Sequence, residues 1–219
     1  MEREIIITAD GSSTIHLPEW NEQYHSKHGA IQEAKHVFIK NGLSLFSNKE
    51  ISILEIGFGT GLNSFITFFE AQKLNLTINY VGVEAYPVIF EEIEKLNYVK
   101  QLNATKFKTV FNKMHQENWE SLYEISPKFS LTKRKQFFNE INDENVFDLI
   151  YFDAFGAKVQ PELWTEEIFK LMYTALKSGG VLVTYSAKGS VRRAMQTVGF
   201  TVERLPGPPG KREMLRATK

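Results

Sequence analysis

The sequence predicts an α/β protein built on a mainly parallel sheet of seven strands. From residue 50 onward, short apolar runs typical of buried strands alternate with amphipathic helical segments, and such alternation favours a parallel sheet with helices on both faces. A stretch rich in glycine, residues 57–61, separates the first of these strands from the first helix. The last two strands, at 200–203 and 213–217, are joined by a Gly/Pro-rich loop without a helix. That connection favours an antiparallel strand at one edge of the sheet.

The first 45 residues (1–45) are expected to form an extension ahead of a domain that spans 46–219. Apolar residues at 4–8 and 14–17 flank an Asp-Gly pair at 10–11, which is typical of hairpin turns. A helical pattern then places four apolar side chains on one face: Ile31, Ala34, Val37 and Phe38. This hairpin and helix are expected to pack on the main domain.

The remaining elements alternate along the chain. We expect strands at 51–56, 78–83, 129–131, 146–152 and 181–185. We expect helices at 62–74, 88–99, 114–123, 161–176 and 190–198. The proline at 161 suits a first helical turn, and the Lys-Ser-Gly-Gly run at 177–180 is expected to end that helix. Residues 100–145 give the weakest pattern.

Composition and charge exclude several classes of protein. The 219 residues are 42% hydrophobic, which suits one well-packed domain with an extension. No cysteine is present, so disulfides, cysteine–zinc sites and cysteine nucleophiles are excluded. The 26 basic and 26 acidic side chains balance, so a nucleic acid would need a local patch of charge. The N-terminus does not resemble a signal peptide, and no apolar run approaches the roughly 18 residues of a membrane span, which predicts a cytoplasmic protein with no membrane partner.

The glycine-rich stretch reads Glu55-Ile-Gly57-Phe-Gly59-Thr-Gly61. Glycines at such a place let the backbone turn tightly and let a ligand lie against it, beyond the carboxyl ends of the strands. The third glycine comes one position earlier than in the dinucleotide fingerprint, and no Lys-Ser/Thr pair follows as in a phosphate-binding P-loop. Glu84 ends the next strand, 23 residues after Gly61, close to the interval of about 20 that is typical of a ribose-binding acid. Together these features predict a nucleoside site; a plain strand–helix turn and a strand-end charge are the alternatives.

Residues 55–63, Glu-Ile-Gly-Phe-Gly-Thr-Gly-Leu-Asn, resemble the first motif of class I S-adenosylmethionine-dependent methyltransferases. More narrowly, residues 57–63 resemble the tRNA methyltransferases of the MnmD type and of the methyltransferase half of MnmC. Those enzymes convert 5-aminomethyl-2-thiouridine at the wobble position to 5-methylaminomethyl-2-thiouridine. Three further segments match: Tyr24-His-Ser with Gly29-Ala30 and Glu33, Phe152-Asp-Ala-Phe155 with Pro161-Glu-Leu-Trp164, and Lys211-Arg-Glu-Met-Leu215.

The resemblance implies a fold, a cofactor and partners. These are a Rossmann-like class I methyltransferase fold, S-adenosyl-L-methionine, tRNA as substrate, and a functional link to the enzymes that install the aminomethyl group. The implied cofactor-binding residues are Tyr24, Ser26, Glu55, Gly57, Phe58, Gly59, Gly61, Asn63, Glu84 and Asp153. Members of the superfamily often bind the adenine amine with an acid after the third or fourth strand, but residues 131–135 contain none. We predict no metal, because no pattern of carboxylates supports the loop histidines His25 and His28.

Asp153 lies just beyond the strand at 146–152 and is the predicted catalytic residue. An alkylamine acceptor resembles lysine, with a pKa of about 10.4, so it arrives protonated and must lose a proton before it attacks. We expect Asp153 to orient the amine and to accept that proton, although a carboxylate also stabilises the ammonium; a simple strand cap is the alternative. The Asn-Pro-Pro-Tyr motif of methyltransferases that act on planar amines is absent, which agrees with an aliphatic acceptor. Phe155 either stacks on the target base or packs in the core.

Basic residues gather near the C-terminus. Residues 186–219 contain eight Lys/Arg and two Glu, so this segment carries a net charge of +6 and the rest of the chain carries −6. Such a cluster suits phosphate contacts, which supply most non-specific affinity for nucleic acid. A solvated basic face with acidic neighbours is the alternative. The predicted substrate-binding residues are Phe155 and the cations Lys188, Arg192, Arg193, Lys211 and Arg212.

Three functions fit these observations. The first is S-adenosylmethionine-dependent N-methylation of an aminomethyl group on a tRNA wobble uridine, with or without the 2-thio group. The second is transfer of a methyl or aminopropyl group to a small amine, which would not need the basic C-terminal segment. The third is a non-catalytic module that presents a surface to RNA or protein and would tolerate the loss of Asp153.

Overall fold

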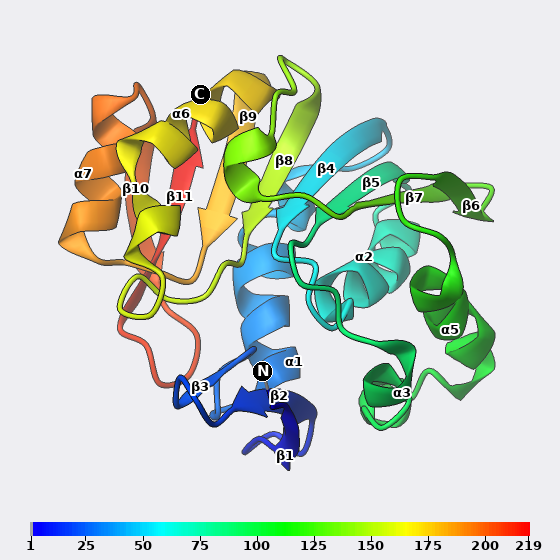
Figure 1. The fold of residues 1–219 in the computed structure, drawn as a ribbon. Helices are drawn as coiled ribbons and strands as arrows, with labels where there is room; N and C mark the ends of the chain where they lie inside the picture. The colour runs from blue at the N-terminus through cyan, green and yellow to red at the C-terminus, as the bar shows by residue number, and fades with distance from the viewer. Residues whose placement is uncertain (1) are drawn as a thin grey trace.

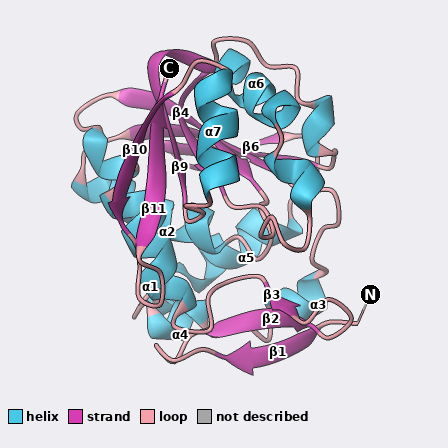
Figure 2. Ribbon diagram, turned by 90° about the vertical axis from the view of Figure 1, so that its left-hand side faces the viewer, coloured by secondary structure: helices cyan, strands magenta, loops and turns pink. Residues whose placement is uncertain are grey.

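An eight-stranded sheet flanked by helices forms the centre of the molecule, and a small three-stranded sheet lies below it (Figures 1 and 2). The structure is a computed structural model that describes residues 2–219. The strands of the large sheet lie in the order β10-β11-β9-β8-β4-β5-β7-β6. Their bounds are β4 Glu50–Ile56, β5 Thr77–Val83, β6 Leu122–Ser126, β7 Phe129–Arg134, β8 Phe147–Phe152, β9 Leu176–Thr184, β10 Thr201–Pro206 and β11 Glu213–Thr218.

The five strands from β9 to β7 in this order are parallel, so the α/β fold expected from the sequence is confirmed. The antiparallel arrangement expected at one edge is confirmed by β10 and β11: β10 is the outermost strand, and β11 is antiparallel to both β10 and β9. One detail differs from the expectation. The sheet has eight strands instead of seven, because β6 pairs antiparallel with β7 as an additional edge strand. β6 escaped detection because it is half-exposed and its outer residue Leu122 is 72% exposed, which blurs the apolar alternation.

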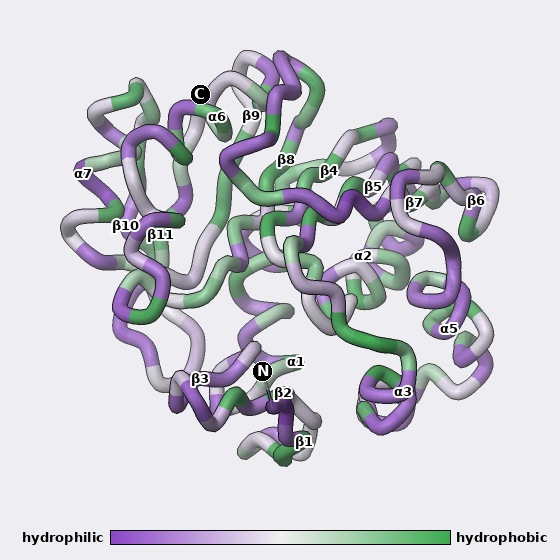
Figure 3. Tube along the Cα trace, in the orientation of Figure 1, coloured by the Kyte–Doolittle hydropathy of each residue, from purple (hydrophilic) through white to green (hydrophobic). Residues whose placement is uncertain are grey.

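Side chains along the central strands alternate between two hydrophobic cores, as the two-residue period of a strand requires. In β8, Leu149 and Tyr151 face the core beneath α1, α2 and α5, whereas Ile150 and Phe152 face the core beneath α6 and α7. Figure 3 shows apolar residues along β8 and β9 at the centre of the molecule. The α-helices are α1 Ala30–Ala34, α2 Leu62–Lys73, α3 Phe90–Ile93, α4 Tyr98–Gln101, α5 Lys108–Gln116, α6 Glu166–Ala175 and α7 Gly189–Thr197.

Several helices have bounds that differ from the sequence expectation. The helix expected at 88–99 is two short helices, because Asn97 bonds to Ser13 of the N-terminal hairpin between them. Of the helix expected at 114–123, only residues 114–116 belong to a helix, α5, and residues 122–123 begin the strand β6. The helix expected at 161–176 is interrupted, because Thr165 caps a new helix, α6. Residues 177–180 continue into β9 and do not end a helix. The other short helical segments are the π-helix η1 Lys35–Lys40 and the 3-10 turns η2 Leu43–Leu45, η3 Thr105–Phe107, η4 Phe138–Glu140 and η5 Pro161–Trp164.

The N-terminal strands β1 Glu4–Ile7, β2 Ser13–Leu17 and β3 Glu22–Gln23 form the small antiparallel sheet. The expected hairpin is confirmed, and β3 was not expected. The small sheet lies below the carboxyl ends of the central strands (Figure 1). Its side chains Ile15 and Leu17 belong to the same core as the helices that follow, so the boundary at residue 45 stays a prediction. Within residues 2–219, no helix combines the length and the apolar character needed to cross a membrane.

Candidate active site

A cavity of about 1340 Å³ opens at the carboxyl ends of the central strands. Its walls come from the loop after β4, the segments after β5 and β7, the segment after β8, the N-terminal residues around β3, and the loop between β10 and β11. Ligand pockets in proteins typically measure about 300–1000 Å³, so this cavity has room for more than one small molecule. Its position is the one expected for ligands of open α/β sheets.

The glycine loop forms one wall of the cavity and fixes an acid beside it. Gly57 has a φ of +86°, and a Cβ there would lie 2.7 Å from the Asp153 carbonyl oxygen, so only glycine fits this contact between the β4 and β8 loops. The backbone N–H of Gly59 donates to Glu84 Oε2 (3.1 Å), and the N–H of Tyr86 donates to Glu84 Oε1 (3.0 Å). Burial raises the pKa of Glu84, and these N–H groups oppose that rise. Gly61 immediately precedes α2.

Asn63 connects two carboxylates at the floor of the site. Its amide nitrogen donates both protons, one to Glu55 Oε1 and one to Asp153 Oδ2, each at 2.8 Å. The Tyr80 hydroxyl donates to the other oxygen of Glu55 (2.8 Å). Burial raises the pKa of Glu55 well above its usual range, against the effect of these two hydrogen bonds. Glu55 is 1% exposed and lies behind Asn63, outside the lining of the cavity. The structure therefore gives Glu55 no direct contact with the cavity.

The carbonyl oxygen of Asn63 is buried and has no hydrogen-bond partner within residues 2–219. Leaving such a group unsatisfied costs about 1–3 kcal/mol, and Asn63 lines the cavity. The site therefore holds a buried acceptor that is ready for a donor from a ligand, such as an ammonium group. The sequence motif included Asn63, but the free oxygen could not be foreseen, because it depends on both carboxylates occupying the amide nitrogen.

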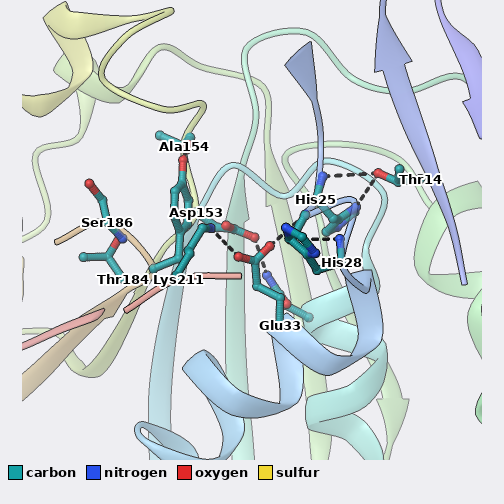
Figure 4. A network of polar contacts seen from close by, with 12 residues as sticks. Thr14, His25, His28, Glu33, Asp153, Ala154, Thr184, Ser186 and Lys211 are labelled. Carbon is teal, nitrogen blue, oxygen red and sulfur yellow. Dashed lines mark hydrogen bonds and ion pairs between the residues drawn. The ribbon is translucent and has the colours of Figure 1, made fainter. Parts of the chain in front are cut away.

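Asp153 lines the cavity, and its second carboxylate oxygen has no hydrogen-bond donor within the described chain. Burial raises the pKa of Asp153 to about 7; the charge of Glu33 adds to this rise, whereas the Asn63 hydrogen bond and Lys211 oppose it. Figure 4 shows Asp153, Glu33 and Lys211 converging from three segments that are distant in sequence. A carboxyl group with a pKa near neutrality suits proton transfer at physiological pH.

Lys211 forms an ion pair with Glu33, and its ammonium lies 3.8 Å from the centre of the Tyr185 ring. Glu33 also accepts a hydrogen bond from the backbone N–H of Ser26 (2.9 Å). The structure thus turns Lys211 toward the cavity and pairs it with Glu33, which the prediction of a free phosphate-binding cation did not foresee. The two residues are far apart in sequence, so no local pattern signals this pair.

Three other predicted cofactor residues have different environments. The Tyr24 ring packs above Gly59, where a Cβ would lie 3.1 Å from it, and burial raises the Tyr24 pKa to about 12. Ser26 lines the cavity, and its hydroxyl accepts a hydrogen bond from the backbone N–H of His28 (3.2 Å). The Phe58 ring is 3% exposed and packs on Gly82, so the structure gives that ring a packing role.

Two aromatic side chains that sequence reasoning missed line the cavity beyond Glu84. Tyr86 and Phe137 are 62% and 52% exposed, and their ring centres are 6.0 Å apart. Asn139 follows them in the lining. Because these residues come directly after β5 and β7, their position after strand ends was the signal available in the sequence. Phe137 and Asn139 closely follow residues 131–135, the stretch that contains no acid for binding the adenine amine.

Of the two loop histidines, His28 is exposed and lines the cavity, whereas His25 is held by the protein around it. Burial lowers the pKa of His25 to about 4, and its ring bonds to the Thr14 hydroxyl (3.0 Å). Within residues 2–219, no group of three or more His, Asp or Glu side chains has the arrangement of a metal site. Trp164 is 5% exposed and packs between Phe152 and Tyr185, as a packing residue would.

The other predicted cations lie outside the cavity. Lys188, Arg193 and Arg212 are exposed, and Arg192 is half-buried at the start of α7. None of these four forms an ion pair within the described residues, whereas Arg204 and Arg216 of the same basic segment pair with glutamates across β10 and β11. Lys219 also forms no ion pair within residues 2–219, but its ammonium donates to Asn145 Oδ1 (2.9 Å) and to the Leu176 carbonyl (2.6 Å).

Comparison with known proteins identifies the family. Residues 94–219, more than half of the chain, match the model of a family described as S-adenosyl-L-methionine-dependent methyltransferase. The chain belongs to this family. The methyltransferase is also 29% identical over 217 residues to the tRNA 5-methylaminomethyl-2-thiouridine biosynthesis bifunctional protein MnmC of Leptospira borgpetersenii, with 90% of this chain and 32% of the relative covered. The MnmC protein of Cupriavidus metallidurans is 28% identical over 227 residues, with coverage of 96% and 33%. The chain thus spans about a third of the length of these relatives.

A solved structure agrees with these relatives. The crystal structure of MNMC2 from Aquifex aeolicus superposes with a TM-score of 0.74 and 26% identity, covering 99% of this chain and 70% of that chain. Spermidine synthase from Thermotoga maritima, at 17% identity and a TM-score of 0.56, shares the fold alone. The Rossmann-like methyltransferase fold and the family resemblance read from residues 55–63 are therefore confirmed.

The residues of the methyltransferase fit its cofactor. Gly57 and Gly59 of the glycine loop line the cavity, Glu84 offers carboxylate oxygens beside that loop, and the buried Asn63 oxygen lacks a donor. S-adenosyl-L-methionine carries ribose hydroxyls and an amino group that suit these acceptors. The assignment of single residues to the cofactor is a proposal, developed below.

Proposed function

We propose that the methyltransferase transfers a methyl group to the exocyclic amine of 5-aminomethyl-(2-thio)uridine at the tRNA wobble position, giving 5-methylaminomethyl-(2-thio)uridine. The names of the MnmC relatives support this substrate. The chain spans about a third of those relatives, and the proposal concerns the methyl transfer alone. The observation that carries it is Asp153, a carboxyl group with a pKa near neutrality and a free oxygen in the cavity beside the glycine loop.

Four residues are proposed to hold the cofactor. Backbone groups of Gly57 and Gly59 lie against it, Glu84 accepts hydrogen bonds from the ribose hydroxyls, and Asn63 Oδ1 accepts one from the amino group. When bound, S-adenosyl-L-methionine supplies a methyl group activated by a sulfonium. Because such a transfer is an in-line displacement, the contribution of the protein is mainly to position the acceptor.

Asp153 and its surroundings favour an amine as the acceptor. Glu22, Glu33 and Asp153 line the cavity, and one of its four lining cations, Lys211, is paired with Glu33. The ionised Asp153 attracts an ammonium and orients it through its free oxygen. The amine must lose a proton before it attacks, and Asp153 accepts that proton when it is ionised. Asn63 holds the other oxygen of Asp153 in place during this step.

Four unpaired cations, Lys188, Arg192, Arg193 and Arg212, are proposed to contact tRNA phosphates. They belong to the segment 186–219, which carries eight basic and two acidic residues. Phosphate contacts of this kind supply affinity and orientation and leave recognition of the base to the cavity. We also propose a functional link to the enzymes that install the aminomethyl group, because their product is the acceptor.

Transfer of a labelled methyl group tests the proposal. The purified protein is incubated with labelled cofactor and either tRNA from cells that lack this gene or a panel of small amines, with Asp153→Asn as a matched inactive control. We expect label in the undermodified tRNA and none with Asp153→Asn. Label in small amines only would favour the alternative of a small-molecule methyltransferase, and no label in any acceptor would favour a non-catalytic module.

A further inference from the structure

A cluster of three aromatic side chains lies at the cavity on the side of Asp153, and Trp20 is its exposed member. Phe155 follows Asp153 by two residues, and its ring centre lies 5.0 Å from the Tyr24 ring and 5.7 Å from the Trp20 ring, edge to face in both cases. All three rings line the cavity. Trp20 is 36% exposed, whereas Trp164 is 5% exposed. Trp20 is therefore a cavity residue and not a core residue.

The turn between β2 and β3 presents Trp20 to this place. The backbone N–H of Trp20 donates to the Leu17 carbonyl (3.2 Å), and that of Asn21 donates to the Pro18 carbonyl (3.1 Å). Asn21 has a φ of +48°, a left-handed conformation that asparagine adopts more readily than most residues. Two hydrogen bonds and a left-handed residue define a tight turn with the indole near its tip.

Phe155 is held from the opposite side of the cavity. Its carbonyl accepts a hydrogen bond from Trp164 Nε1 (2.7 Å), and the preceding carbonyl, of Ala154, accepts one from the Tyr185 hydroxyl (2.8 Å). Both donors belong to side chains packed against the core beneath α6 and α7. The segment that carries Asp153 and Phe155 is thus fixed by buried groups, while the Phe155 ring faces the N-terminal turn.

We propose that Trp20 and Phe155 together bind the unpaired pyrimidine base that carries the acceptor amine: because the two rings are nearly perpendicular, the base stacks on the face of one ring and packs against the edge of the other. This inference rests on the proposed function. The amine is joined to the base through one methylene, so a base whose amine reaches Asp153 must lie beside Phe155, two residues away. Aromatic side chains supply affinity for unstacked bases of any sequence, because every base has a π-face. The N-terminal turn is thereby a substrate-binding element.

Steady-state methyl transfer to 5-aminomethyl tRNA tests the role of Trp20. We expect Trp20→Ala to raise KM for tRNA about tenfold, which corresponds to about 1.4 kcal/mol, and Trp20→Phe to recover most of that loss. Ile7→Ala is the matched control, because Ile7 is an exposed apolar residue of the same small sheet outside the cavity. Affinity for S-adenosylhomocysteine should be the same in all four proteins. A Trp20→Ala variant whose KM for tRNA stays within about twofold of the wild-type value would overturn the inference.

Tryptophan fluorescence gives a second readout that needs no turnover. An RNA stem–loop with an unpaired uridine should quench the emission of the wild type and of Ile7→Ala, and most of this quenching should be lost in Trp20→Phe. Equal quenching in Trp20→Phe would contradict the inference. Quenching that depends on Trp20 without methyl transfer would contradict only the proposed function, and methyl transfer that is independent of Trp20 would contradict only this inference.

Discussion

Both the nitrogen and the oxygen of the Asn63 side-chain amide contribute to the candidate site. The nitrogen holds Glu55 and Asp153 at 2.8 Å each, and the oxygen is buried without a hydrogen-bond donor in a residue that lines the cavity. A single residue therefore fixes the proposed catalytic carboxylate and offers an acceptor for the cofactor. This arrangement explains why Glu55 matters although it does not reach the cavity: it occupies one proton of the amide and leaves the other for Asp153.

The pH dependence of methyl transfer should follow Asp153. Its pKa is about 7, so the carboxyl becomes protonated below that pH and no longer accepts a proton from the amine. We expect kcat/KM for tRNA to fall by about tenfold per pH unit below pH 7. Glu33→Gln removes a charge that raises the Asp153 pKa and releases Lys211, so the fall should move to lower pH. Glu19→Gln, at an exposed position of the same segment, should leave the profile unchanged.

The stability of the folded protein should depend on the protonation state of Asp153. The folded pKa of Asp153 lies above its ordinary value of 3.8, so the folded state binds the proton more tightly, and the stability from this group is lost as pH rises toward 7 and beyond. At pH 8 the ionised carboxylate therefore destabilises the fold. Asp153→Asn should raise Tm at pH 8 by about 3 °C and abolish activity. Calorimetry at pH 8 and pH 5 measures this difference; an equal or lower Tm of the variant at pH 8 would count against the raised pKa.

At the scale of elements, the glycine loop, Glu84 and Asp153 could be predicted because each follows a strand, and parallel strands bring their carboxyl ends to one edge. Contacts between segments that are distant in sequence could not be predicted. The Lys211–Glu33 pair joins residues 178 positions apart, and the role of Trp20 depends on a two-residue strand, β3, that has no periodic signal. β6 was missed for a related reason, because an exposed edge strand buries too few side chains to show alternation.

Arg3, which precedes β1, links the small sheet to the wall of the cavity where the cofactor is proposed to bind. Arg3 donates to Glu92 Oε2 and to the Tyr86 carbonyl, both at 2.9 Å, and lines the cavity near Glu84. Arg3→Met removes these links between the small sheet and the segment after β5. We expect it to weaken binding of S-adenosylhomocysteine about five- to tenfold, as loss of a charged hydrogen bond typically costs more than about 1 kcal/mol. Calorimetric titration measures this change, and Arg3→Lys, which keeps the charge, should lose less. Unchanged affinity in Arg3→Met would separate the small sheet from cofactor binding.

The whole molecule has no net charge, but its charges are unevenly divided along the chain. The segment 186–219 carries an excess of six positive charges, and five of its eight cations form no ion pair within residues 2–219. The cavity, in contrast, is lined by charges of both signs, and its carboxylates include Asp153, Glu33 and Glu22. A polyanion with a cationic amine at one point matches this division, since its phosphates and its amine would meet opposite charges at different places.

The salt dependence of tRNA binding tests this division. Each phosphate contact contributes about 0.7–0.9 to the slope of log affinity against log salt concentration. The double variant Lys188→Gln, Arg193→Gln should therefore reduce the slope by roughly 1–2. Lys73→Gln is the control, because Lys73 ends α2 away from the cavity and pairs with Glu70. A slope equal to that of the wild type would show that α7 does not contact the phosphates.

The position of the transferred methyl group tests the central claim most directly. Aminomethyl tRNA is incubated with the protein and a cofactor that carries a deuterated methyl group, the tRNA is digested, and the nucleosides are analysed by mass spectrometry. Our account predicts the label on the exocyclic nitrogen of 5-methylaminomethyluridine or its 2-thio form. A label on the ring, the ribose or the sulfur, or no label in the wobble nucleoside, would contradict it.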